Sequence, residues 1–156
     1  MPLQSYVPHV DLLAKAMRIP RERLTSRARI AIEAPLLRLI LARLVATLPF
    51  SEPFYRNAYP DLAAAAASGQ ITDLHHHFIE TGYFEGRLGA PPDLDDAFYL
   101  AAYPEVAHAI AHGDTASPLD HYLRAGAAEG RVPSAAQAPE IEAWMRLLQV
   151  QMRPEA

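Results

Sequence analysis

Hydrophobic side chains recur along this chain at intervals of three and four residues, and no useful stretch alternates apolar with polar positions. The first spacing is typical of helices and the second of strands, so the pattern predicts an all-α protein. A short helix is expected over 10–17, ending before Pro20. Pro35 divides the next apolar stretch into a helix over about 21–33 and another over 35–48, because proline lacks the backbone donor of a helix interior.

The helix expected over 35–48 has one broad apolar face, with Arg38 and Arg43 outside it. A helix this apolar either packs into the core of its own chain or associates with another chain. We expect part of the face to be left for a second copy, which makes the protein a homo-oligomer in the form of a two-fold dimer. The residues expected to form this association helix are Leu37, Ile40, Leu41, Leu44 and Leu48.

The middle of the chain contains two similar copies of one sequence segment. Residues 54–87 read FYRNAYPDLAAAAASGQITDLHHHFIETGYFEGR, and residues 98–131 read FYLAAYPEVAHAIAHGDTASPLDHYLRAGAAEGR. The second copy follows the first at an offset of 44 positions without a gap, and both copies end in Glu-Gly-Arg. Identity at one fixed offset predicts a tandem structural unit.

Each copy predicts three short helices. In the second copy, Pro104 suits the first position of the middle helix, and Gly113 suits its left-handed end. Ser117 is expected to cap the third helix, and Asp73 takes the same role in the first copy, because short polar side chains accept bonds from free backbone N–H groups. Gly126 is expected to end that third helix.

The chain of 156 residues fits one compact domain, or a small domain with an appended helical arm. A final helix is expected over 139–152, after a short linker. The predicted parts are a basic N-terminal helical arm over 1–50, repeat units over 51–92 and 93–134, and a linker with the C-terminal helix over 135–156.

The net charge of −4 gives no reason to expect a nucleic-acid partner. Basic residues nevertheless gather within 15–43, either as a solvated helix face or as a docking surface for an acidic partner or membrane phospholipid. The chain has no cysteine, which excludes disulfides and thiolate sites and fits a reducing compartment. No secretory leader and no transmembrane segment are recognised, so the sequence favours a soluble, cytoplasmic protein.

Three consecutive histidines, His75, His76 and His77, suggest a metal site at first sight. Successive helical residues point about 100° apart, so the three side chains cannot all face one ion. Only His77 has a counterpart in the second copy, which is His121. We therefore expect no metal, and one structural histidine per repeat that is bonded to the backbone or to a tyrosine hydroxyl.

Each copy carries two tyrosines that are spaced four residues apart and share a helix face. Such rings either pack between helices, with each hydroxyl bonded, or stack on a saccharide. Repetition favours packing, because each unit must build its own core. The tyrosines concerned are Tyr55, Tyr59, Tyr99 and Tyr103.

The arginines that close the two copies, Arg87 and Arg131, are interpreted as structural clamps that pair with Asp61 and Glu105. The alternative is an anion site at the repeat junction. No Ser-His-Asp pattern, phosphate loop or pair of catalytic carboxylates stands out. The sequence therefore predicts no catalytic residue, no enzymatic activity and no cofactor.

The pattern FYxxxYP(D/E)(L/V)A…G…H(F/Y)…G…EGR resembles a bacterial repeat found beside or within glycosyltransferases and other exopolysaccharide-assembly proteins, and in some large surface proteins. The resemblance covers about residues 51–134 and includes no nucleotide-sugar-binding domain. The chain departs from that repeat at Tyr59 and Tyr103, where the family often has asparagine before the proline.

The resemblance implies a non-enzymatic accessory or scaffold protein of bacterial exopolysaccharide biosynthesis that acts by protein–protein interaction. A glycosyltransferase or synthase complex is the expected partner, and such a complex would hold the protein in the cytoplasm or at the periphery of the inner membrane. The alternative is a saccharide-binding module that uses the repeated tyrosines.

Overall fold

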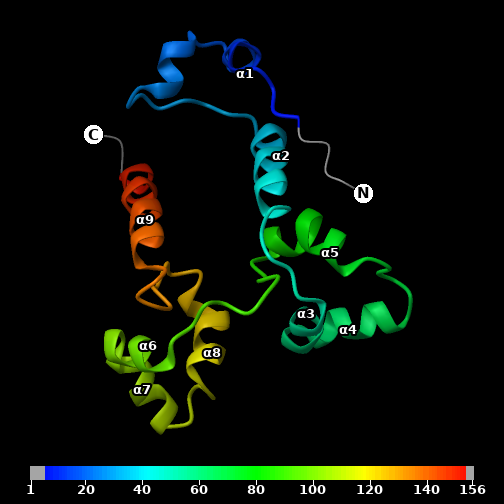
Figure 1. The fold of residues 1–156 in the computed structure, drawn as a ribbon, viewed down its shortest axis with the longest axis vertical. Helices are drawn as coiled ribbons and strands as arrows, with labels where there is room; N and C mark the ends of the chain where they lie inside the picture. Colours follow the sequence, from blue (N-terminus) through cyan, green and yellow to red (C-terminus); the bar gives the residue numbers. More distant parts are fainter. Residues whose placement is uncertain (1–5, 154–156) are drawn as a thin grey trace. The chain divides into compact units, whose positions relative to one another are not determined.

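The computed structural model describes residues 6–153 of the chain. Within that range the regular elements are helices and helical turns, without a strand, which confirms the all-α fold. The chain divides into two compact units, Met1–Leu44 and Val45–Ala156 (Figure 1). Each unit is described by itself below.

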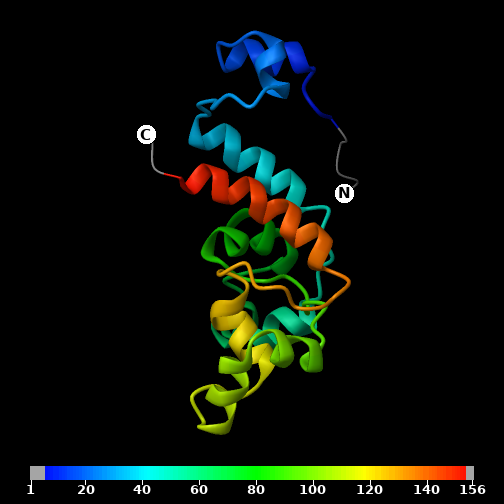
Figure 2. The ribbon, with the colours of Figure 1, turned by 90° about the vertical axis from the view of Figure 1, so that its left-hand side faces the viewer.

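The first unit begins with two short helical elements. Helix α1 covers Val10–Ala16, and the 3-10 helix η1 covers Arg21–Thr25. The two elements lie against each other, as the blue segment in Figures 1 and 2 shows. Asp11 in the first turn of α1 accepts a hydrogen bond from Arg21 at 3.3 Å, which ties the start of one element to the start of the other.

The helix expected over 21–33 is wrong beyond Thr25, since residues 26–33 contain no helix. Ser26 supplies the physical reason. Its hydroxyl donates to the Arg23 carbonyl at 2.8 Å and accepts from the Ala28 N–H at 3.1 Å. Local side-chain bonds of this kind offer the backbone an alternative to the helical ladder, and they are favoured where helices end.

Helix α2 covers Ala34–Val45, close to the expected 35–48. Pro35 lies in the first turn, where a missing N–H has no helical partner to lose. The helix ends at Val45, earlier than the predicted Leu48, where Pro49 disfavours helical backbone. Val45, the last residue of α2, is 2% exposed and belongs to the core of the second unit.

The second unit contains two copies of one helical arrangement. Each element of the second copy begins and ends 44 residues after its counterpart in the first. The first copy consists of α3 (Glu52–Ala58), α4 (Pro60–Ala67), α5 (Leu74–His77) and the π-helical turn η2 (Phe78–Gly82). The second copy consists of α6 (Asp96–Ala102), α7 (Pro104–Ala111), α8 (Pro118–His121) and the π-helical turn η4 (Tyr122–Gly126).

The predicted caps are confirmed in both copies. The Asp73 carboxylate accepts from the His76 N–H at 2.8 Å, and the Ser117 hydroxyl accepts from the Asp120 N–H at 3.0 Å. Gly113, which follows α7, has φ +79° and takes the predicted left-handed position. The start of the third helix in each copy is therefore set by the residue that the sequence indicates there.

The third helix of the second copy ends at Gly126, as predicted, since η4 covers Tyr122–Gly126. In the first copy the helix instead passes through Gly82 and continues as η3 (Tyr83–Glu85). The left-handed positions fall later, at Gly86 with φ +81° and at Gly130 with φ +70°. Gly82 and Gly126 serve a different purpose, since a Cβ at either position would collide with a tyrosine hydroxyl beneath it.

Each copy has its own apolar core, and each core is built around one tyrosine with no exposed surface. The last helix, α9 (Ala138–Met152), matches the expected 139–152. Its first turns pack on the second copy, where Met145 lies against Gly130. The core of the first copy comprises Val45, Tyr55, Leu62, Leu74 and Phe78. The core of the second copy comprises Tyr99, Val106 and Tyr122.

Candidate functional site

The buried tyrosine of each copy is paired with the repeated histidine. The Tyr55 hydroxyl lies 3.1 Å from Nδ1 of His77, and the Tyr99 hydroxyl lies 2.9 Å from Nδ1 of His121. Burial raises the pKa of Tyr55 to about 12, so the hydroxyl remains protonated at neutral pH. The interpretation of one structural histidine per repeat, bonded to a tyrosine hydroxyl, is confirmed.

Burial also decides what these two tyrosines can contact. Tyr55 and Tyr99 are 0% exposed, so neither ring has a face that a sugar could stack on. Both rings instead pack edge-on or tilted against neighbouring aromatic side chains. Of the four repeated tyrosines, only Tyr59 and Tyr103 remain as rings on which a saccharide could stack.

Arginine guanidinium groups lie over the rings of Tyr59 and Tyr103. The Tyr59 oxygen accepts from the Leu88 N–H at 2.8 Å, and the guanidinium of Arg87 lies 5.0 Å from the centre of the Tyr59 ring. In the second copy, Arg131 lies 4.7 Å from the centre of the Tyr103 ring. A cation over the ring face is a favourable contact, and it covers the surface that a ligand ring would need.

The two arginines form the carboxylate pairs that the sequence predicts. Arg87 binds Asp61 through both terminal nitrogens, at 3.0 and 2.8 Å, and donates from Nε to Glu85 at 2.8 Å. The hydrogen bond from Arg87 holds the pKa of the Asp61 carboxyl below its usual range. In the second copy Arg131 donates to Glu105 through one terminal nitrogen and to Glu129 from Nε. Because two carboxylates surround each guanidinium, a further anion would be opposed by their charge.

The run of three histidines does not converge. His75 and His76 are exposed, and His75 stacks on Phe50 with 4.7 Å between ring centres. Only His77 turns inward, toward Tyr55. Across residues 6–153, no three histidine, aspartate or glutamate side chains are grouped so that they could hold a metal ion.

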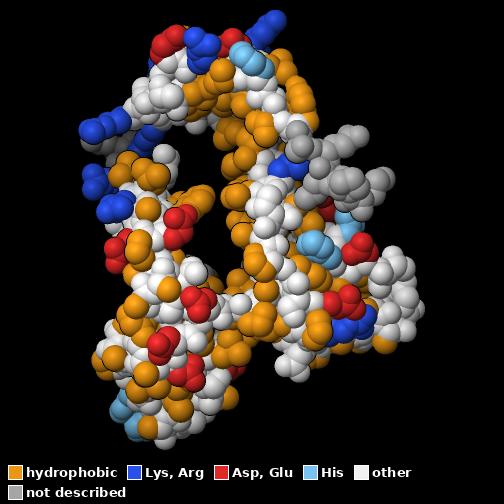
Figure 3. Space-filling view, viewed as in Figure 1, with side chains coloured by type: hydrophobic (Ala, Val, Ile, Leu, Met, Phe, Trp, Pro, Cys, Tyr) orange, Lys and Arg blue, Asp and Glu red, His pale blue; other side chains and the backbone are white. Residues whose placement is uncertain are grey.

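The proposed association residues lie on α2 and just after it. Leu37 is 42% exposed, Leu39 is 51% exposed and Ile40 is 44% exposed. Leu44 and Leu48 are similarly exposed, whereas Leu41 is half-buried. Figure 3 shows hydrophobic side chains along α2 on the face in view. The helix therefore presents an apolar surface, although Leu41 contributes less to it than its position suggests.

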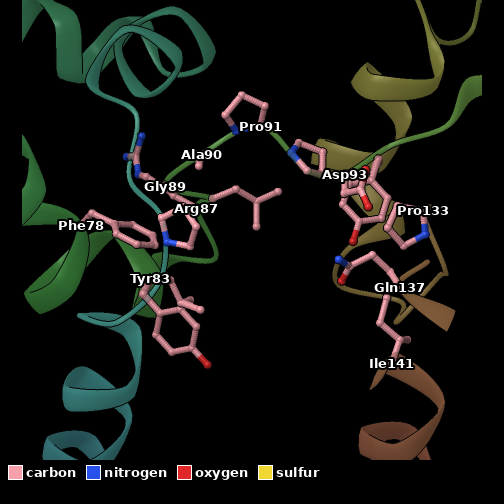
Figure 4. A pocket seen from close by; sticks show the side chains of 15 residues that line it. Phe78, Tyr83, Arg87, Gly89, Ala90, Pro91, Asp93, Pro133, Gln137 and Ile141 are labelled. Carbon is pink, nitrogen blue, oxygen red and sulfur yellow. The ribbon is translucent and has the colours of Figure 1, made fainter. Parts of the chain in front are cut away.

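A groove of about 350 Å³ lies in the second unit, at the junction of the two copies. Its residues include the linker between the copies, from Leu88 to Asp93. Phe78 and Tyr83 lie on one side in Figure 4. Pro133, Gln137 and Ile141 lie on the other side. The groove is thus bounded by the first copy, by the linker, and by the start of α9.

Both copies contribute equivalent positions to this groove. Five pairs of lining residues stand 44 positions apart, namely Leu48 and Pro92, Pro49 and Asp93, Phe78 and Tyr122, Gly89 and Pro133, and Asp93 and Gln137. The sequence reasoning did not identify this site, because no motif marks it. A comparison of the copies would have given one signal, since Tyr122 adds a hydroxyl where the first copy has Phe78.

No protein-family model, curated protein or solved structure matches the chain. No helix between residues 6 and 153 is both long enough and apolar enough to cross a membrane. The resemblance to a repeat of exopolysaccharide-assembly proteins therefore stays a prediction from the residue pattern.

Proposed function

We propose that this protein is a non-enzymatic scaffold that self-associates through α2 and acts by protein–protein contacts in bacterial exopolysaccharide assembly. The observation that carries the proposal is the row of exposed aliphatic side chains on α2, including Leu37, Leu39 and Ile40. An apolar helix face of this kind is typical of a surface that a protein partner covers.

The free energy that burial of this face would contribute favours a second copy of the chain as that partner. A fully exposed aliphatic side chain contributes about 1.5–3 kcal/mol when it is buried, so each half-exposed residue of α2 contributes on the order of 1 kcal/mol. In a two-fold interface each residue is buried twice, which gives about 8 kcal/mol for four residues in two chains. Association costs about 4–15 kcal/mol in lost freedom, so the doubled contribution is of the size that a dimer requires.

Each repeat is held closed by its own hydrogen bond, so the two repeats can act as a rigid platform. In the first copy the Ser51 N–H donates to the Gly89 carbonyl at 2.8 Å, and in the second the Asp95 N–H donates to the Pro133 carbonyl at 3.1 Å. Each copy is thereby closed from its last residues back to its first. Such a platform could hold a glycosyltransferase or synthase complex in the cytoplasm or at the periphery of the inner membrane, as the sequence resemblance suggests.

Ile40→Asp tests the self-association. Light scattering on the wild-type chain should give a dimer, and the variant should give a folded monomer with unchanged helical circular dichroism, because a carboxylate in a buried seam is costly. Leu147→Asp is the matched control, since Leu147 is an exposed leucine of α9 and the charge change is the same. A wild-type monomer at all concentrations, or a dimer that Ile40→Asp leaves intact, contradicts the proposal.

A second experiment tests the assembly role. The chain carrying an affinity tag is purified from its native bacterium, and the proteins that accompany it are identified by mass spectrometry. We expect a glycosyltransferase or polysaccharide synthase among them, in amounts comparable to the chain itself. Loss of the gene with no change in the secreted polysaccharide would contradict this role, and it would leave the dimer experiment unaffected.

A further inference from the structure

The groove between the two copies contains a tyrosine hydroxyl that no other residue of the described part of the chain engages. Tyr122 lines the groove and is 9% exposed. Its hydroxyl has no hydrogen-bond partner within residues 6–153, yet no side-chain oxygen of that range is both fully buried and unpartnered. The hydroxyl therefore opens into the groove. Burial raises the pKa of Tyr122, so the hydroxyl is protonated at neutral pH and can donate.

This hydroxyl is not needed for packing. The equivalent position of the first copy holds Phe78, whose ring fills the corresponding core without an oxygen. Both rings pack against the buried tyrosine of their own copy, with 5.8 and 5.9 Å between ring centres. A buried polar group normally has a partner, so a hydroxyl that is dispensable for the core and directed at a groove points to a ligand.

Two further polar groups line the groove. Asp93 offers a carboxylate, which accepts hydrogen bonds, and Gln137 offers a carboxamide, which both accepts and donates. The buried Ser134 donates to Asp93 at 3.2 Å, and this bond orients the carboxylate. The ligand must therefore supply both O–H or N–H donors and acceptor oxygens.

Arg87 also lines the groove, with its guanidinium paired to Asp61 and Glu85, and the rest of the lining is mostly apolar and rigid. Prolines 49, 91, 92 and 133 all contribute, and proline has a fixed backbone angle and no N–H. Tyr83 adds an aromatic ring that is 37% exposed and held edge-on by Phe84 at 5.2 Å between ring centres. A flat ligand with apolar C–H faces and polar edges would match such a surface.

We propose that this groove binds a neutral hydroxylated ring of the pyranose type, with Tyr122, Asp93 and Gln137 bonding its hydroxyl groups. A proline-rich peptide fits less well, because it offers few donors for the Asp93 carboxylate. An acidic ligand is opposed by Asp93 and by the two carboxylates paired with Arg87. The proposal goes beyond the scaffold function and does not depend on α2.

Saturation-transfer NMR on the full chain tests the proposal. The probes are glucose, galactose, mannose, rhamnose and cellobiose, with glucuronate and glucosamine as charged counterparts. We expect saturation transfer to at least one neutral sugar, with amide shifts in the nitrogen-edited spectrum at Gly89, Asp93 and Gln137. Transfer only to glucosamine would identify an amine site and overturn the proposal, and so would a panel without any transfer.

The decisive variant is Tyr122→Phe, which installs the residue that the first copy already uses. One neutral hydrogen bond is lost, so the affinity should fall about threefold to tenfold, while the melting temperature changes little. Asp93→Asn should weaken binding further, because the hydrogen bonds to the ionised carboxylate are the stronger ones. Tyr83→Ala removes the stacking ring and should also weaken binding.

The control is Tyr6→Phe, which removes a hydroxyl from an exposed tyrosine of the first unit. This control should bind sugars like the wild-type chain. Unchanged binding in both Tyr122→Phe and Asp93→Asn would show that sugars bind elsewhere, and it would overturn the proposal. Light scattering of these variants separates this site from self-association, because none of the substitutions lies on α2.

Discussion

The Tyr55 hydroxyl lies 3.1 Å from Nδ1 of His77, in a core where the tyrosine ring has no exposed surface. This contact requires the helix of His77 to approach the ring closely. The close approach is possible because residue 82, one turn later, is glycine. Tyr99, His121 and Gly126 take the same three positions in the second copy, so both cores contain the same close contact between a tyrosine and a glycine.

Gly82→Ala should destabilise the protein by about 1–3 kcal/mol, which is the usual penalty for overpacking a core. The added Cβ would collide with the Tyr55 hydroxyl. Urea unfolding measures the loss. Combining Gly82→Ala with Tyr55→Phe removes the colliding oxygen, so the double variant should be less destabilised than the sum of the two single variants. Strict additivity would show that the collision is not the cause.

The stability of the protein should fall between pH 10 and about 12. Burial raises the pKa of Tyr55 and of Tyr99 from 10.0 to about 12. In that range the unfolded chain has released these protons and the folded chain retains them, so stability decreases as the pH rises. Urea unfolding at several alkaline pH values measures the slope. Tyr55→Phe should reduce it, and an unchanged slope would contradict the assignment.

The pairing of Arg87 with Asp61 and of Arg131 with Glu105 should stabilise the protein less as the pH falls. Hydrogen bonds from the arginines hold the pKa of Asp61 and of Glu105 below their usual ranges. The contribution is present above the ordinary carboxyl pKa and is lost as the pH falls through the depressed value in the folded state. Arg87→Lys should therefore shift acid unfolding to higher pH, because lysine cannot form the paired contact.

Arg56→Lys is the comparison for that experiment. Arg56 forms an exposed pair with Glu52 four residues earlier on α3, at 2.8 Å, and such surface pairs contribute little. Its acid unfolding profile should overlay that of the wild-type chain. Equal shifts in the two arginine variants would mean that the clamp has no special role.

Ser117→Ala should cost about 1 kcal/mol, since the hydroxyl caps α8 by accepting from the Asp120 N–H. Thermal unfolding measures the effect. Ser68→Ala is the matched control, because the Ser68 hydroxyl only donates to the Ala65 carbonyl at an exposed helix end. A larger loss in the control than in Ser117→Ala would contradict the capping role.

Local chemistry explains what the sequence predicts well. The offset between the copies predicts equivalent helices, and short-range rules place Asp73 and Ser117 at the helix starts. The pairing of Arg87 with Asp61 follows from repetition, because the same charge pattern occurs in both copies. These features depend on spacing along the chain or on a pattern that is present twice.

Features that depend on three-dimensional proximity are not predictable in this way. The reason for a glycine at position 126 is missed, because a Cβ there would collide with the hydroxyl of Tyr99, which is 27 residues earlier. The groove at the repeat junction is missed because its polar residues come from positions as distant as Asp93 and Gln137.

The prediction of a helix over 21–33 is wrong for a local reason, since the hydrogen bonds of Ser26 outweigh the apolar spacing.

The closure of each copy by its own hydrogen bond, from Ser51 to Gly89 and from Asp95 to Pro133, has a consequence for the history of such chains. A copy that is closed on itself and has a separate core can be duplicated as a block of DNA without redesign of its neighbours. Recombination between the copies would then add or delete 44 residues at a time, and each block would carry its own buried tyrosine. Related genes are expected to differ in copy number by whole blocks, with α2-like and α9-like segments kept at the two ends.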